Sequence, residues 1–257
     1  MAVQLSEIGA FARKHDPDRF FCALFAPPEP REALFALIGY QHELGRAREA
    51  ASNPMIAAIR LQWWRDALEQ PRRHEVATPL RNAMAAGLLV PADLLAMADA
   101  REAELEEEGI PSRAALGAYL RGAHGGLAVA AGRMLGAAGP ELAALQAVGA
   151  AHGLAALLRA TPALAARGRC LLPLDLLAEA GLTLHEAMAA PGRLAPLIRE
   201  LAQPPAPPRS WPAALIPAAL PALLARRDLG RLALGRPARR GTADRMALLL
   251  AAWRRRA

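Results

Sequence analysis

Residues 34–46 read LFALIGYQHELGR, a stretch whose apolar side chains recur at helical spacing. Pro30 precedes this stretch and the sequence SNP follows it at residues 52–54. Proline is favoured in the first turn of a helix, and Ser-Asn-Pro is typical of a break between helices. We therefore expect one long helix over about Arg31 to Ala51.

A second helical stretch, residues 152–164, reads HGLAALLRATPAL. Side chains four residues apart lie on one face of a helix, so carboxylates at such a spacing face one cavity. The first stretch has His42 and Arg46 at this spacing, and the second has Ala160 and Leu164. Neither pair supplies the oxygen ligands that a hard cation such as Mg²⁺ prefers.

The composition predicts an all-α protein. Hydrophobic residues make up 54% of the 257 residues, but aromatic residues only 4%. Most of the apolar residues are alanine and leucine, which are strong helix formers, whereas residues typical of strands are scarce. We expect a single domain over 1–257, with a Pro-rich linker at 203–212 and C-terminal helices at 213–257 that pack back onto the core.

The formal net charge is +7, carried almost wholly by arginine. The basic residues are scattered and no nucleic-acid-binding motif accompanies them, so we do not expect nucleic acid as a partner. Cys22 and Cys170 have no metal-ligand spacing and are expected to pack as small hydrophobic residues. The N-terminus resembles neither a signal peptide nor a transit peptide. The apolar run at 134–158 is broken by Pro140 and favours a buried helix over a membrane span.

Helical patterns extend along most of the remaining chain. Prolines, glycines and capping residues divide the patterns into segments. The first expected helix begins after residue 16. Further helices are expected over about 56–68, 91–108, 112–135, 140–159 and 174–180. The helix at 140–159 is expected to end near Arg159, before Thr161 and Pro162, because proline interrupts a helix.

Residues 60–68 read RLQWWRDAL and place two adjacent tryptophans on a helix. Adjacent helical side chains point about 100° apart, so Trp63 and Trp64 face different surroundings. One can enter the core while the other meets a cavity or a neighbouring helix. Core tryptophans beside solvated arginines are the simpler interpretation of this stretch alone.

The order of several motifs resembles the squalene/phytoene synthase family over about residues 17–200. The motifs are the Tyr40 helix, RLQWWR at 60–65, DARE at 99–102, Tyr119 with an Ala/Gly stretch, and GRCLLPLD at 168–175. The resemblance implies a single all-α isoprenoid synthase domain with a central cavity. Enzymes of that family join two prenyl diphosphates, and two Asp-rich helices hold Mg²⁺ against the diphosphate.

The family's metal-binding acids are missing at the matching positions. The first Asp-x-x-x-Asp motif falls on His42 and Arg46, and Glu43 is the remaining acid in that turn. In the second motif the two aspartates fall on Ala160 and Leu164. That motif's asparagine becomes Ala156, and its arginine is kept as Arg159. The resemblance therefore implies a scaffold without its metal site.

A narrower resemblance points to one branch of the family, the complex I assembly factor of mitochondria and its bacterial relatives. It rests on YQHELG at 40–45, MIAAIRLQWW at 55–64 and LRATP at 158–162. It implies a non-catalytic helper that binds a complex I subunit, and a prenyl or quinone-like lipid in the cavity. It also implies a cytoplasmic bacterial protein peripheral to the inner membrane, or a mature mitochondrial form on the matrix side.

Two alternatives stay open, a divergent prenyltransferase that needs Mg²⁺ and an isoprenoid-binding protein without a complex I role. We expect no catalytic residue, no resident metal and no cofactor under the assembly hypothesis. A cavity lined by His42, Arg46, Trp63, Trp64, Ala160 and Leu164 is expected in every case. The residues expected to line a cavity or bind an anion are Tyr40, Glu43, Arg60, Trp63, Trp64, Arg159 and Arg169.

Overall fold

Several helices of the protein begin at a proline or after a capping side chain, as the sequence predicts. The computed structural model describes residues 5–51, 53–205 and 210–257. The Asp16 side chain accepts a hydrogen bond from the Arg19 amide at the start of a helix, and Asn53 caps another in the same way. Each cap satisfies a backbone N–H that has no partner inside its helix.

Every secondary-structure element in the described residues is a helix, which confirms the all-α prediction. One isolated β-bridge joins Ser210 to Arg256. The N-terminal half contains α1 (Glu7–His15), α2 (Pro17–Ala23), α3 (Pro28–Glu49), α4 (Pro54–Glu69), α5 (Ala77–Ala85), α6 (Pro91–Ala100), the 3₁₀ helix η1 (Arg101–Glu104) and α7 (Arg113–Tyr119). The π-helix η2 (Leu120–Gly125), α8 (Gly126–Met134) and α9 (Pro140–Ala165) follow. The remaining elements are α10 (Leu174–Glu179), α11 (Leu184–Ala189), η3 (Pro191–Leu194), α12 (Ala195–Leu201), η4 (Ala213–Leu215), α13 (Ile216–Ala219), α14 (Pro221–Ala233) and α15 (Thr242–Arg254).

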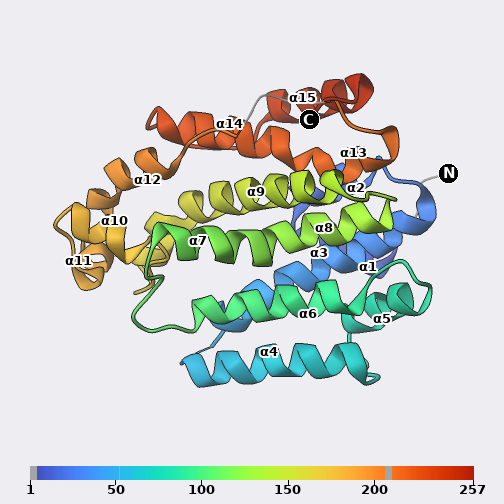
Figure 1. Ribbon diagram of the computed structural model, residues 1–257, viewed down its shortest axis with the longest axis horizontal. Coiled ribbons are helices and arrows are strands. Elements are labelled where there is room, and N and C mark those ends of the chain that lie inside the picture. Colours follow the sequence, from blue (N-terminus) through green and yellow to red (C-terminus); the bar gives the residue numbers. More distant parts are fainter. Residues whose placement is uncertain (1–4, 52, 206–209) are drawn as a thin grey trace.

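The long helices lie side by side in a stack (Figure 1). In this view α4 lies at the bottom, α14 and α15 lie at the top, and α10 to α12 close one end. Helix α9 runs through the middle and packs against η2, α8 and α14. It is long and apolar enough to cross a membrane by length and composition. Its position between other helices fits the buried helix that the sequence favours.

The core consists of two clusters of buried hydrophobic residues. The larger one gathers side chains of α1 to α6, α8 and α13 to α15, with Leu145 near the start of α9. The second gathers side chains of α7, η2, α10 to α12 and α14 around Leu157 and Leu158 in the second half of α9. Cys22 and Cys170 are both free and buried, as expected. Helix α9 therefore joins the two clusters.

Two expectations about the helices need correction. The helix that begins at Pro91 stays α-helical only to Ala100 and continues as 3₁₀ helix to Glu104, short of the expected residue 108. Helix α9 continues through Pro162 to Ala165 and does not end near Arg159. Pro162 lies in the last turn, so its missing N–H removes a single helical hydrogen bond. Helices α1, α5, α11 and α12 were not predicted at all.

The chain beyond the Pro-rich segment packs back onto the core, as predicted. Trp211 is buried, and its indole N–H donates to the carbonyl of Ala257 at 3.3 Å. Helix α13 is buried along its whole length. Residues 206–209 of the expected linker lie outside the described residues.

Candidate functional site

His42, the first of the four motif positions, faces α1. Its ring lies 4.1 Å from the ring of His15 and 5.7 Å from that of Phe11, between ring centroids. Its Nε2 atom is buried and has no hydrogen-bond partner among the described residues. Burial, together with the nearby His15 and Arg46, lowers the pKa of His42 to about 4. The imidazole is therefore neutral near pH 7 and is packed as part of the α1–α3 contact.

Arg46, the second position, points into an open surface groove. Its guanidinium makes an ion pair of 3.5 Å with Glu43, and its side chain is 51% exposed. The groove, which we call the α3–α4 groove, has a volume of about 360 Å³. It is lined by Glu43, Arg46, Ala47, Arg60, Trp63, Trp64 and His74. Five of these residues were singled out from the sequence, and the fold brings them together.

Aromatic rings form the floor of the α3–α4 groove. The Trp63 and Trp64 rings meet edge-on at 4.9 Å, and His74 lies 5.2 Å from Trp64. Trp64 is buried and also contacts Tyr40, whose hydroxyl donates to the carbonyl of Leu94 at 2.9 Å. Trp63 is only partly buried. The two tryptophans thus divide as predicted, one into the core and one towards the groove.

Ala160 and Leu164, the other two motif positions, lie near the end of α9 and do not line the α3–α4 groove. Their neighbour Arg159 makes an ion pair of 2.5 Å with Asp228 of α14, whose carboxylate is 1% exposed. Asp228 also pairs with Arg240 and with Arg231. Arg159 therefore holds α14 against α9.

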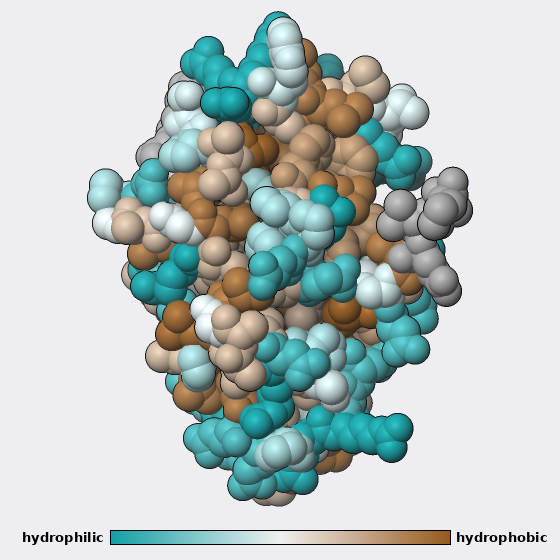
Figure 2. Space-filling view, turned by 90° about the vertical axis from the view of Figure 1, so that its right-hand side faces the viewer, coloured by the Kyte–Doolittle hydropathy of each residue, from teal (hydrophilic) through white to brown (hydrophobic). Residues whose placement is uncertain are grey.

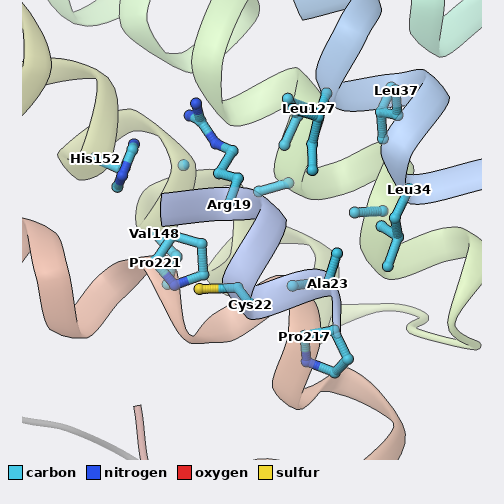
Figure 3. A pocket seen from close by; sticks show the side chains of 15 residues that line it. Arg19, Cys22, Ala23, Leu34, Leu37, Leu127, Val148, His152, Pro217 and Pro221 are labelled. Atoms are coloured by element: carbon cyan, nitrogen blue, oxygen red, sulfur yellow. The ribbon is translucent and has the colours of Figure 1, made fainter. Parts of the chain in front are cut away.

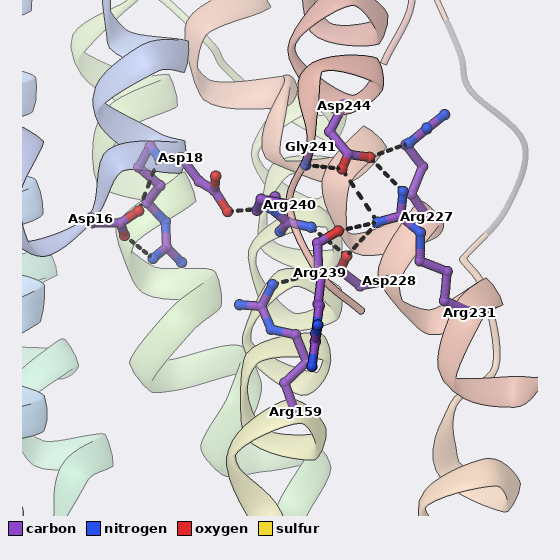
Figure 4. A network of polar contacts seen from close by, with 11 residues as sticks. Asp16, Asp18, Arg159, Arg227, Asp228, Arg231, Arg239, Arg240, Gly241 and Asp244 are labelled. Carbon is purple, nitrogen blue, oxygen red and sulfur yellow. Dashed lines mark hydrogen bonds and ion pairs between the residues drawn. The ribbon is translucent and has the colours of Figure 1, made fainter. Parts of the chain in front are cut away.

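These contacts continue as a network across the C-terminal region (Figure 4). Arg240 also binds Asp18 of α2 at 2.5 Å. Burial alone would raise the pKa of Asp244, but hydrogen bonds from Arg231, Arg227 and the Gly241 amide bring it down to about 2. The network ties α2, α9, α14 and α15 together, and its carboxylates are already saturated by arginines.

Arg169 belongs to a buried polar cluster that sequence reasoning missed. Its guanidinium donates to Glu104 at 3.2 Å, and Glu104 also accepts from Arg101 and from the Tyr119 hydroxyl. Arg101 and Glu104 are 6% and 8% exposed. Burial followed by the Arg101 charge lowers the pKa of nearby His124 well below its ordinary value.

Gln41 links this cluster to the π-helix η2. In the amide orientation that satisfies both ends, its oxygen accepts from Arg101 at 2.6 Å and from His124 Nδ1 at 3.2 Å. Its nitrogen then donates to the carbonyl of Ala123 at 2.9 Å. π-helical turns often occur at functional sites. In the sequence, an Arg at 101 three residues before a Glu at 104 resembles an ordinary surface pair, so nothing marked it as buried.

The interior holds a small cavity between α2, α3, α8 and α9 (Figure 3). Its volume is about 30 Å³, room for one or two water molecules. Cys22, Leu34, Leu127 and Val148 help line it, and Arg19 and His152 reach its polar end. Within the described chain neither ring nitrogen of His152 has a partner. Burial, followed by the Arg19 and Arg159 charges, lowers the pKa of His152.

The six residues that were expected to line one cavity together do not do so in either of these two cavities. None of the six residues expected to share one cavity lines the interior cavity, and neither cavity includes Ala160 or Leu164. Side chains of two hydrophobic clusters fill the space between the helices, and α1 covers His42.

The residues at the four motif positions do not fit a magnesium site. An imidazole, a guanidinium, a methyl group and an isobutyl group offer no oxygen ligand, and Glu43 is paired with Arg46. Within the described ranges no three His, Cys, Asp or Glu side chains gather in a way that could hold a metal ion.

The helical stack is a squalene/phytoene-synthase-type helical fold. The family model for squalene/phytoene synthase matches residues 12–204. The chain belongs to the squalene/phytoene synthase family.

Solved structures share the fold. A dehydrosqualene synthase has a TM-score of 0.69 at 12% identity, with 96% of this chain and 94% of that chain covered. The squalene synthase HpnC from Alicyclobacillus acidocaldarius has a TM-score of 0.60 at 20% identity, with 96% and 93% covered.

Sequence relatives carry another name. The NADH dehydrogenase (ubiquinone) complex I assembly factor 6 of Mus musculus is 29% identical over 179 residues, 66% of this chain and 53% of the relative. The Homo sapiens protein of that name is 29% identical over 172 residues, 64% of this chain and 51% of the relative. The chain spans about half the length of the curated relatives it matches.

Proposed function

We propose that this protein is a non-catalytic member of its family that assists assembly of respiratory complex I by binding. The observation that carries the proposal is the sequence similarity to complex I assembly factor 6, in a chain whose four metal-ligand positions hold no carboxylate. Without oxygen ligands, Mg²⁺ would not be held to neutralise a departing diphosphate. The scaffold then serves recognition.

We place subunit binding at the α3–α4 groove. Its aromatic floor offers apolar contact area, and Arg46 and Arg60 offer charged hydrogen-bond donors at its rim. Tryptophan and arginine are the side chains that most often dominate binding energy at protein interfaces. The groove is open to solvent and thus accessible to an extended segment of a partner.

A prenyl or quinone-like lipid remains a proposal as a ligand. The interior cavity of about 30 Å³ is far smaller than a pocket for a drug-sized ligand, which occupies several hundred Å³. To enter this cavity, such a lipid would have to move the helices apart. We further propose that the protein works at the inner membrane as a peripheral protein, on the cytoplasmic side in a bacterium or the matrix side in a mitochondrion.

A deletion strain complemented with variants tests the assembly role. Loss of the gene should lower NADH:quinone oxidoreductase activity and the amount of assembled complex, while carotenoid and hopanoid levels stay unchanged. Wild type should restore the complex, and Trp63→Ala/Arg60→Glu should restore it poorly at equal protein level. Arg13→Glu on α1, an exposed arginine outside the groove, is the matched control and should complement fully. An unchanged complex I level in the deletion strain would disprove the role.

The prenyltransferase alternative has its own test. Purified protein incubated with farnesyl or geranylgeranyl diphosphate and Mg²⁺ should release no pyrophosphate above the rate without protein. Sustained, Mg²⁺-dependent turnover would overturn the non-catalytic proposal.

A further inference from the structure

Helix α15 carries an apolar stripe that the core does not use. Met246, Leu249, Leu250 and Trp253 are 63%, 44%, 45% and 78% exposed. Their spacing of three and four residues places them on one face of the helix. Contiguous exposed apolar side chains on a folded protein mark interaction sites far more often than isolated ones do. We call these four residues the α15 stripe.

The opposite face of α15 is firmly attached. Leu248 and Ala251 are buried in the larger hydrophobic cluster. Asp244 is 2% exposed, binds Arg227 at 2.6 Å and Arg231 at 2.8 Å, and accepts the Gly241 amide at 3.0 Å. The stripe therefore faces outward from a helix whose orientation is fixed by α14.

Arginines are the exposed charged residues of the segment 242–257. They are Arg245, Arg254, Arg255 and Arg256, and within the described chain none of the four makes an ion pair through its side chain. The one acidic side chain of this segment is Asp244, which is buried and already paired. The stripe is thus flanked by positive charge without a compensating exposed acid. In Figure 2, apolar and hydrophilic side chains lie next to each other in the upper part of the molecule, the level at which Figure 1 places α15.

A second exposed apolar group lies on α4 and differs in its charge. It comprises Met55, Ile56 and Ile59, which are 74%, 37% and 63% exposed. Helix α4 carries the acids Asp66 and Glu69 beside the arginines Arg60 and Arg65, so its side-chain charges balance, whereas the exposed charges of the segment 242–257 are all positive. Figure 1 places α4 at the opposite end of the stack from α15. Charge complementarity to an anionic surface therefore favours α15.

We propose that the α15 stripe and its flanking arginines dock the protein onto an anionic phospholipid bilayer. A helix with one apolar face and cationic flanks lies in the plane of the membrane interface, with its apolar side chains among the upper acyl chains. Trp253 would lie at headgroup level, where tryptophan is enriched, and the arginines would contact lipid phosphates. The inference gives a surface to the peripheral membrane contact proposed above and rests on that part of the proposed function. It does not depend on complex I.

The test is cosedimentation of the purified full chain with vesicles. Vesicles of phosphatidylcholine with about one third phosphatidylglycerol should bind the protein at about 0.1 M salt, and pure phosphatidylcholine should bind it at least about tenfold more weakly. Raising the salt to about 1 M should weaken the binding, because the Debye length falls to about 3 Å. Soluble glycerol phosphate should not compete, since it lacks acyl chains.

Variants separate the two contributions. Leu250→Ser/Trp253→Ser should weaken binding about tenfold or more by removing buried apolar area. Arg254→Ser/Arg256→Ser should remove the preference for anionic vesicles. Met55→Ser/Ile59→Ser on α4 is the matched control and should bind like wild type. Trp253→Phe should still bind but lose the blue shift of tryptophan fluorescence. Trp64 and Trp211 are buried already, and Trp63 lies on α4 at the other end of the stack.

Several results would overturn the docking surface. They are equal binding to neutral and anionic vesicles, unchanged binding by Leu250→Ser/Trp253→Ser, or competition by glycerol phosphate. A concentration-dependent dimer that the same double variant abolishes would assign the stripe to a second copy of the chain. If the vesicle-binding tests fail but the deletion strain has less complex I, the membrane role of the α15 stripe is disproved and the assembly role is not.

Discussion

His42 occupies a setting that disfavours its charged form, and this makes the stability of the protein depend on pH. Burial, then His15 and Arg46, lower its pKa from 6.5 to about 4. The unfolded chain binds the proton at the ordinary pKa, so unfolding takes up a proton between pH 6.5 and 4. The contribution of neutral His42 to folding is complete above pH 6.5 and is lost as the pH falls towards 4.

We expect His42→Gln to reduce the loss of stability on acidification. The free energy of unfolding, measured by urea denaturation at pH 7 and pH 5, should fall less for the variant than for wild type. The pKa values of His124 and His152 are also lowered in the folded protein, so some pH dependence of the stability should remain in both proteins. An equal fall in both proteins would contradict the assignment to His42.

Glu104 is the buried partner of two arginines, and its removal should be costly. Glu104→Gln should lower the free energy of unfolding by about 3–5 kcal/mol, because it leaves the charge of Arg101 buried without a carboxylate. Glu102, two residues away, pairs with Arg65 but is 59% exposed. Glu102→Gln should therefore cost less than about 1 kcal/mol. Similar losses in urea denaturation for the two variants would refute the distinction.

At the scale of single elements, the packing of α9 against η2 depends on two glycines. A Cβ at Gly149 would lie 2.4 Å from the carbonyl oxygen of His124 and 2.8 Å from Gly125 Cα. A Cβ at Gly153 would lie 2.4 Å from Cγ of the His124 ring. Backbone atoms cannot give way cheaply, so the helices must separate if Gly149 is replaced. At Gly153 the His124 ring would have to move.

Gly149→Ala should destabilise the protein by about 2–3 kcal/mol through this overpacking. Gly230, in the interior of α14, would place a Cβ in open space. Gly230→Ala is the matched control and should stabilise by up to about 1 kcal/mol, because alanine loses less conformational entropy in a helix. Thermal unfolding of the two variants decides the matter, and a tolerated Gly149→Ala would show that α9 can shift.

The elements that follow proline and a capping side chain could be predicted from the sequence, as at Pro17 and Pro54. These signals act within a few residues, so one sequence displays them. Helix α1 was missed because its apolar face is short, and its partner on α3 lies far along the chain. The continuation of α9 past Pro162 depends on packing against α14 and α11, which no local signal conveys.

The candidate site could be predicted only in part for the same reason. The grouping of Arg60, Trp63 and Trp64 follows from their spacing on one helix, and Glu43 and Arg46 join them through the α3–α4 contact. The Arg101–Glu104–Tyr119 cluster depends on burial, which their residue types conceal. Helix α1 was not predicted from the sequence, so the orientation of His42 towards it could not be predicted either.

At the scale of the whole molecule, the directions in which the four motif positions face decide whether carboxylates there could bind one metal ion. His42 faces α1, Arg46 faces the α3–α4 groove, and Ala160 and Leu164 line neither of the two cavities. Carboxylates at these positions would therefore not converge on one ion.

Two double variants, His42→Asp/Arg46→Asp and Ala160→Asp/Leu164→Asp, and their combination test this expectation. Each should fold by circular dichroism if kept below its unfolding temperature, and Mg²⁺ should leave the melting temperature unchanged. Binding of an ion to the native state alone would raise that temperature. A Mg²⁺-dependent rise in the combined variant that is absent from both double variants would show that the four positions do converge.

Helix α9 contributes its first half to one hydrophobic cluster and its second half to the other. If one cluster opened alone, half of α9 would lose its packing contacts. The backbone hydrogen bonds of α9 continue without a break to Pro162, so the two halves are held together. The two clusters should consequently unfold as one cooperative unit. The amide protons at the centre of α9 would then exchange with solvent only through complete unfolding, more slowly than those of α4 or α15 at the two ends of the stack.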